Sequence, residues 1–226
     1  MKSLALLILW CFALCLLIHC FAIYEELPFL RIVSKLFLLP MLIIYLYLDS
    51  WAHNRDVSSL AIAGLILSFI GDTILTQPGQ TMFLIGMLAF IGTHICNSFY
   101  FLHLQKGGES RYGIMLASAL ILLVVSVAVF WLLHAVLGNM QVPIGVYMAF
   151  ISTMAVLATG VYRKETVRKA AIRFFIPGAF LFVVSDAVLA LNKFSLHNTQ
   201  ADIVVMLTYG LAQYFLVRGF ATAGNK

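Results

Sequence analysis

Charge is scarce in this sequence. Only 10% of its 226 residues are charged, whereas 63% are hydrophobic. A chain with so little charge could not cover a water-soluble globule with polar surface, so we expect lipid to surround this fold. The formal net charge of +5 does not indicate a nucleic-acid partner, because the basic residues sit in short loops between apolar runs.

Motifs for metal, nucleotide and redox chemistry are also missing. The four cysteines lie in apolar stretches without a CxxC pair, which argues against a disulfide framework or a zinc motif. No histidines have HxxxH or HExxH spacing, and no GxSxG, P-loop or dinucleotide fingerprint occurs. We therefore predict neither a metal nor a cofactor.

Long apolar runs fill nearly the whole chain instead. A transmembrane helix needs about 20 apolar residues. Runs of this kind, separated by turn or charge signals, predict eight spans at about 4–23, 32–48, 58–76, 81–104, 113–137, 143–162, 170–192 and 202–222. The first run begins like a signal peptide, but it is too long and no A-x-A site follows it. The predicted fold class is all-α, a polytopic transmembrane helical bundle in which residues 1–226 form a single domain.

The basic residues predict the orientation of the spans. With an even number of spans, both termini share one side of the membrane. That side holds 11 of the 14 Lys and Arg residues. They are Lys2, Arg55, Lys106, Arg111, Arg163, Lys164, Arg168, Lys169, Arg173, Arg218 and Lys226. The positive-inside rule then places both termini in the cytoplasm, and in a bacterium the protein would lie in the inner membrane.

Two aspartates lie inside the predicted spans. A charged side chain at the centre of a span costs roughly 2.5–3.5 kcal/mol, so such a residue normally faces the bundle interior or a water-filled cavity. Asp72 lies about one turn, and Asp186 roughly two turns, from the outer end of its span. If their helices are neighbours, the carboxyls could flank one cavity, one as an acid and the other as a base or charge stabiliser. The alternative is that each is a polar staple between helices.

Further polar side chains fall in the same half of the membrane or near its middle. We expect them to form a polar shell that binds a substrate and water. The lysines and the histidine also have a structural explanation, since a lysine near a helix end extends to the headgroups and a buried histidine forms a hydrogen bond with a neighbouring helix. The predicted shell consists of Lys35, His94, Asn192, Lys193, Tyr209 and Gln213.

A short internal similarity links the two aspartates. Residues 69–75 (FIGDTIL) resemble residues 183–189 (VVSDAVL), and the offset of 114 positions is close to half the chain. Two parallel four-helix repeats would explain this pattern, but the match covers only a few residues.

Four segments around the aspartates form a recognisable set. They are residues 68–75 (SFIGDTIL), 83–94 (FLIGMLAFIGTH), 184–194 (VSDAVLALNKF) and 206–213 (MLTYGLAQ). Together they resemble the YhhN-type lysoplasmalogenase family. The resemblance extends from about the second span to the C-terminus, and Lys35 and Pro40 also fit it, whereas Asn97 stands where an aromatic residue is expected.

The resemblance implies an eight-span ether hydrolase. Its expected substrate is a lysophospholipid of the lysoplasmalogen type, whose vinyl ether bond is cleaved to a fatty aldehyde and glycerophosphoethanolamine or glycerophosphocholine. Asp72 and Asp186 would supply general acid and base catalysis. Because it lies farther from the end of its span, Asp186 is expected to be the more buried aspartate and the better acid. The alternative function is a proton-coupled transporter of a small molecule or lipid that uses the same aspartates.

Overall fold

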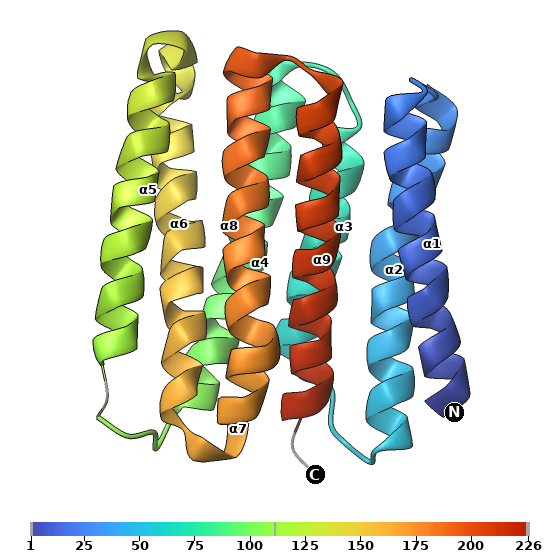
Figure 1. Ribbon diagram of the computed structural model, residues 1–226, viewed down its shortest axis with the longest axis vertical. Coiled ribbons are helices and arrows are strands. Elements are labelled where there is room, and N and C mark those ends of the chain that lie inside the picture. Colours follow the sequence, from blue (N-terminus) through green and yellow to red (C-terminus); the bar gives the residue numbers. More distant parts are fainter. Residues whose placement is uncertain (1, 111, 225–226) are drawn as a thin grey trace.

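The computed structural model describes residues 2–110 and 112–224, which form a bundle of long helices (Figure 1). Apolar runs of this length fold as helices because a backbone in hydrocarbon must satisfy its own hydrogen bonds. The helices are α1 (Lys2–Tyr24), α2 (Pro28–Ala52), α3 (Ser59–Leu75), α4 (Gln80–Gln105), α5 (Gly113–Leu137), α6 (Gln141–Gly160), the short α7 (Glu165–Ala170), α8 (Ile176–Leu191) and α9 (Thr199–Ala223). π-helical turns cover Ala171–Phe175, between α7 and α8, and Asn192–Leu196, after α8. Arg111 and Lys226, which contribute to the predicted orientation, lie outside the described residues.

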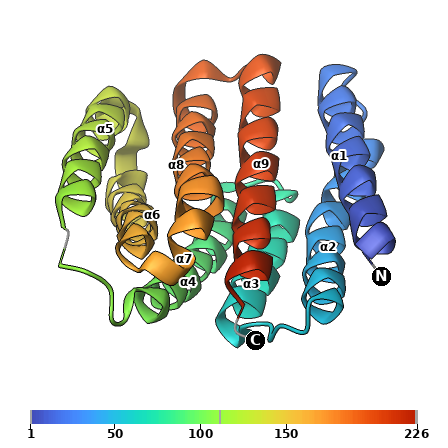
Figure 2. The same ribbon diagram turned by 60° about the horizontal axis from the view of Figure 1, so that its bottom comes forward.

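The middle of the bundle consists of α3, α4, α8 and α9 (Figures 1 and 2). The pair α1 and α2 lies on one side of this group, and the pair α5 and α6 lies on the other. In the middle, α3 packs along α4 and α8 packs along α9. On the flanks, α2 contacts α3 and α9, whereas α6 contacts α4 and α8. The prediction of an all-α polytopic bundle is confirmed.

Six stretches of the described chain are long and apolar enough to cross a membrane. One of them, Gly113–Arg163, folds back on itself as α5 and α6, and the 17-residue α3 is shorter than a typical span. The chain is a multi-pass membrane protein. The count of eight crossings stays a prediction, as do the single domain over residues 1–226 and the two four-helix repeats.

Local signals set several helix ends. Pro28 stands in the first turn of α2, where its missing N–H breaks no helical hydrogen bond. Gly79 precedes α4 with a φ of 107°, a backbone conformation that is strained for any residue with a Cβ atom. Asn198 caps α9, because its side chain accepts a hydrogen bond from the backbone N–H of Ala201 at 2.7 Å.

Both ends of the described chain lie at the same end of the bundle, and the turns α1–α2, α3–α4, α5–α6 and α8–α9 lie at the other (Figure 1). Asp72 lies near the end of α3 and Asp186 lies in the second half of α8. Both aspartates therefore belong to the half of the bundle opposite the termini.

Candidate active site

A cavity of about 560 Å³ lies between the helices near the α8–α9 turn. Its volume is in the range of sites that bind small molecules. Asp72 and Asp186 both line it, so α3 and α8 bring two carboxyls from distant parts of the sequence to one space. The charged residues of its lining are Arg31, Lys35, Asp72, Asp186, Lys193 and Asp202. Within residues 2–110 and 112–224, no group of three His, Cys, Asp or Glu side chains could hold a metal ion.

Asp72 has a cation and a hydroxyl group as partners. Lys35 Nζ lies 3.2 Å from Asp72 Oδ1, and the Tyr209 hydroxyl donates a hydrogen bond to Oδ2 at 2.6 Å. Gln213 lies behind Tyr209, where its amide donates to the tyrosine oxygen at 3.2 Å and to Ser68 Oγ at 3.1 Å. A carboxylate that loses its hydration is stable only when a cation and donors replace the water. This set of partners suits the ionised form of Asp72.

Asp186 has no lysine or arginine partner in the described part of the chain. The Tyr147 hydroxyl donates a hydrogen bond to Asp186 Oδ2. His94 Nε2 lies 3.2 Å from the Tyr147 hydroxyl and 3.8 Å from Asp186 Oδ2. His94 is fully buried, and its Nδ1 has no hydrogen-bond partner among the described residues. That environment fits a neutral imidazole, because a charged ring would carry an N–H on both nitrogens.

The two carboxyls also differ in burial. The side chain of Asp72 is 5% exposed and that of Asp186 is 12% exposed. The expectation that Asp186 is the more buried aspartate is therefore wrong. Distance from the end of a span does not determine the exposure of these carboxyls, because Lys35 and Tyr209 both pack directly against Asp72.

The partners of the two aspartates follow the internal similarity of the sequence. Asp72 on α3 meets side chains from α2 and α9, whereas Asp186 on α8 meets side chains from α6 and α4. An offset of 114 positions carries His94 to position 208, next to Tyr209, and carries Lys35 to position 149, close to Tyr147. Of the two helices that this offset relates, α2 presents Lys35 to Asp72 and α6 presents Tyr147 to Asp186.

Side chains at the mouth of the cavity fix the α8–α9 turn. The Asn192 amide donates to a backbone carbonyl of this turn at 3.0 Å and to Asp202 Oδ1 at 2.8 Å. Arg31 Nη2 pairs with Asp202 Oδ2 at 3.0 Å. Lys193 has no acidic partner among the residues described, and its Nζ lies 5.6 Å from the centre of the Phe83 ring. Lys193 is thus the lining cation that no carboxylate pairs with.

The residues singled out in the sequence all lie at the cavity or directly behind it. The cavity lining includes Asp72, Asp186, Lys35, Asn192, Lys193 and Tyr209. His94 lies behind Tyr147, and Gln213 lies behind Tyr209. Their roles in binding or catalysis stay predictions.

Sequence reasoning missed three residues of this site. Tyr147 is the one tyrosine of the largely apolar α6, so its residue type alone gives no signal. The internal similarity could have found it, since it relates Lys35 to that part of the sequence. Arg31 and Asp202 were missed because their pairing depends on α2 lying beside α9.

The fold and the cavity together define a class of protein, a multi-pass helical membrane protein with two carboxyls in one buried site. The sequence then identifies the family. The model of the YhhN family matches residues 30–220, and the chain belongs to the YhhN family.

Several curated relatives carry the name lysoplasmalogenase. The Mycobacterium tuberculosis lysoplasmalogenase is 27% identical over 161 residues, which are 70% of this chain and 59% of that protein. Lysoplasmalogenase TMEM86A of Bos taurus is 31% identical over 160 residues, which are 68% of this chain and 61% of that protein. TMEM86A of Homo sapiens is also 31% identical over 160 residues, with 66% and 60% covered. The chain thus spans about three fifths of the length of these relatives. No solved structure matches the chain.

Proposed function

We propose that this chain is a lysoplasmalogenase. It would hydrolyse the vinyl ether bond of a lysoplasmalogen to a fatty aldehyde and glycerophosphoethanolamine or glycerophosphocholine. The observation that carries the proposal is that Asp72 and Asp186 line one cavity with unlike partners, a cation for the first and neutral groups for the second. The names of the relatives support the same activity.

The first step of this reaction needs an acid next to a negative charge. Protonation of the β-carbon of a vinyl ether gives an oxocarbenium ion, and a positioned acid speeds that step. Asp186 is the proton donor, because it has no lysine or arginine partner among the described residues that would stabilise its ionised form. Asp72, held as a carboxylate by Lys35 and Tyr209, stabilises the cation. Paired carboxyls play these roles for a related cation in glycosidases.

The same two carboxyls can complete the proton cycle. After Asp186 has given its proton to the β-carbon, water adds to the α-carbon and passes a proton to Asp72, which leaves a hemiacetal. Asp186 then takes the proton of the hemiacetal hydroxyl as the bond to the glycerol oxygen breaks, and Asp72 protonates that oxygen. Aldehyde and alcohol leave with both carboxyls in their starting states.

The mouth of the cavity suits an anionic phosphate. With Asp186 protonated, the charged residues described in the lining are three cations and two carboxylates, and Lys193 is the unpaired cation. Lys193 follows Asp186 by seven residues, or about 10.5 Å along a helix. Seven bonds separate the phosphorus of a lysoplasmalogen from its β-carbon. Fully extended, they span about 9 Å, slightly less than the separation of the two residues. We assign the phosphate to Lys193.

A proton-coupled transporter that uses the same aspartates is the alternative function. Transporters of this kind typically bind their cargo at discontinuous helices near the middle of the bilayer. Asp72 and Asp186 lie inside continuous stretches of α3 and α8, near one end of the bundle. This geometry supports hydrolysis better than transport.

Release of free aldehyde tests the proposal. Purified protein in detergent is incubated with a lysoplasmalogen and with its saturated ether and acyl analogues, and we expect aldehyde from the vinyl ether alone. Asp72→Asn and Asp186→Asn should each lower kcat by about 100-fold or more. Asp56→Asn, at an exposed residue of the opposite end, is the matched control and should keep full activity. No aldehyde from the unaltered protein, or undiminished release by both site variants, would contradict the proposal.

A further inference from the structure

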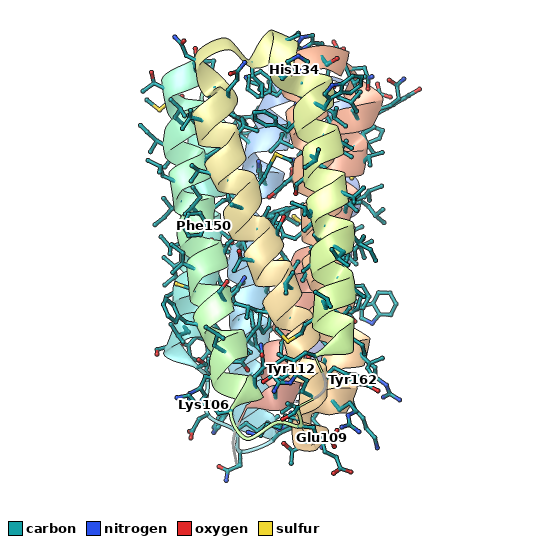
Figure 3. All side chains as sticks on the ribbon, turned by 90° about the vertical axis from the view of Figure 1, so that its left-hand side faces the viewer. Lys106, Glu109, Tyr112, His134, Phe150 and Tyr162 are labelled. Carbon is teal, nitrogen blue, oxygen red and sulfur yellow. The ribbon has the colours of Figure 1, made fainter. Side chains whose placement is uncertain are left out.

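A second hollow lies outside the catalytic cavity, between α5 and α6. This groove has a volume of about 960 Å³, and most of its lining surface is apolar. Figure 3 views the face formed by α5 and α6, with His134 of the groove lining labelled near the top. Two of its hydroxyls form a hydrogen bond with each other, since Ser126 Oγ and Ser152 Oγ lie 3.1 Å apart. The groove therefore offers an apolar surface with few unmet polar groups.

A small void lies between the groove and the catalytic cavity. It measures about 40 Å³ and lies where α5, α6 and α8 meet. Ser126, Met148 and Ser152 line both the void and the groove, whereas Tyr147 and Asp186 line both the void and the catalytic cavity. The Tyr147–Asp186 pair is thus part of the wall that separates the cavity from the inner end of the groove.

The helix that closes the void on its outer side is weakly held. α5 packs mainly against α6 and makes few contacts with α8. Much of its surface faces away from the bundle, as the exposures of 68% for Val124 and 60% for Leu132 illustrate. An element with few buried contacts opens at low cost in free energy. The void can therefore widen by a movement of α5 without disturbing the central helices.

We propose that the groove and the void seat the hydrocarbon chain of the lysolipid substrate, an inference that rests on the proposed function. The chain of a vinyl ether lipid begins at the same β-carbon that Asp186 protonates. It must therefore continue from Asp186 into apolar surroundings. The void and the groove lie next in line, since each shares lining residues with the hollow before it. The phosphate at Lys193 and the chain between α5 and α6 would hold the reacting bond from both ends.

A block in the void tests this seat. Ala187 lines the void and not the catalytic cavity, so Ala187→Leu fills the void. Ala128 is exposed on α5 and lines neither hollow, which makes Ala128→Leu the matched control. We compare kcat/KM for hexadecenyl and butenyl lysoplasmalogens in the same mixed micelles. Ala187→Leu should lower the selectivity for the long chain by about tenfold, the effect of about 1.4 kcal/mol of overpacking, and Ala128→Leu should leave it unchanged. Unaltered selectivity in Ala187→Leu would overturn the proposal.

Photolabelling tests the same seat without turnover. A saturated ether lysolipid with a diazirine at the end of its chain is irradiated on the unaltered protein, and the adducts are mapped by mass spectrometry. We expect adducts at groove residues such as Leu123, Phe130 and Met148, and their loss in the presence of excess hexadecyl lysolipid. Adducts on α1 and α2, or labelling of the groove that the competitor does not reduce, would overturn the seat. Because the probe cannot be hydrolysed, this result is independent of whether the protein releases aldehyde.

Discussion

Tyr147 connects the proposed acid to a buried histidine. Its hydroxyl has one hydrogen, which it donates to Asp186, so His94 must donate its own N–H to the tyrosine oxygen. The hydrogen bond that Tyr147 donates to Asp186 becomes stronger in the slow step, because Asp186 gives up its proton and becomes negative. Tyr147→Phe should therefore lower kcat by about 100-fold with little change in KM, the typical effect of removing one donor to a developing charge.

The control for this change is Tyr47→Phe, because Tyr47 is 51% exposed on α2. Aldehyde release measured over a range of substrate concentrations separates kcat from KM. An effect on KM alone would assign Tyr147 to substrate binding and would contradict its role in the protonation step.

Lys35 and Asp72 form a buried ion pair whose members depend on each other. The side chains are 16% and 5% exposed. Lys35→Met removes the cation and leaves a buried carboxylate, which should destabilise the fold by about 3–5 kcal/mol. The double variant Lys35→Met/Asp72→Asn should regain most of this loss but stay inactive. Thermal unfolding in detergent measures the loss of stability and its recovery. Equal unfolding temperatures for Lys35→Met and the double variant would show that the two residues are not coupled.

Lys193 gives a test of the phosphate assignment. Lys193→Gln should raise KM for a lysoplasmalogen by about tenfold, because a hydrogen bond to a charged group contributes about 1.5–3 kcal/mol. KM for the corresponding alkenylglycerol, which lacks the phosphate, should not change. Lys106→Gln, at an exposed residue of the opposite end, is the matched control. A similar rise in KM for both substrates would contradict the assignment.

A residue of the site was predictable from the sequence when its side chain has a high free-energy cost in the hydrocarbon of the membrane. Asp72 and Asp186 stand out because a carboxyl inside a span needs a reason to be there. Tyr147 does not stand out, because a tyrosine in a span has a low free-energy cost whether it binds Asp186 or only packs against other side chains. The relative burial of the aspartates was also beyond the sequence, because it depends on which neighbours cover each of them.

At the scale of helices, the close packing of α3 against α4 positions Asp72. A Cβ atom at Gly71 would lie 2.8 Å from two ring carbons of Phe90. Phe90 in turn packs edge-on against Tyr209, with ring centres 6.0 Å apart. A shift of Phe90 would therefore also move Tyr209, whose hydroxyl donates a hydrogen bond to Asp72. Gly71→Ala should destabilise the fold by about 1–3 kcal/mol and lower kcat.

Gly113→Ala is the control for this change, because nothing lies within 4 Å of a Cβ at that position. It should keep full activity and the unfolding temperature of the unaltered protein. Thermal unfolding and aldehyde release are measured for both variants, and a fully active Gly71→Ala would show that α3 need not approach α4 so closely.

The positions of the helices were predictable, but their neighbours were not. Apolar length is a strong signal, and a helix lies on each apolar run of the sequence. The side of a helix that faces the bundle leaves no such signal, because lipid and core both favour apolar residues. Leu132 and Leu133 on α5 show this, since the first is 60% exposed and the second is fully buried. For the same reason the contacts between α2 and α9, and the groove between α5 and α6, could not be derived from the sequence.

The whole molecule has an uneven distribution of charge between its two ends. Most basic residues belong to the end with the termini, whereas Arg31, Lys35 and Lys193 lie toward the end with the catalytic cavity. If the basic end is cytoplasmic, as the positive-inside rule predicts, the mouth of the cavity opens to the outer leaflet. Lysolipid would then enter, and aldehyde would leave, from that leaflet.

Labelling of single cysteines in intact cells tests this orientation. Gln77→Cys lies in the exposed turn between α3 and α4 at the cavity end, and Lys106→Cys follows α4 at the opposite end. A membrane-impermeant maleimide should label Gln77→Cys in intact cells and Lys106→Cys only after the membrane is permeabilised. The unaltered chain gives the background, since its four cysteines lie partly buried within α1 and α4. The reverse pattern would place the cavity mouth at the cytoplasmic leaflet, because the structure fixes both turns at opposite ends of one bundle.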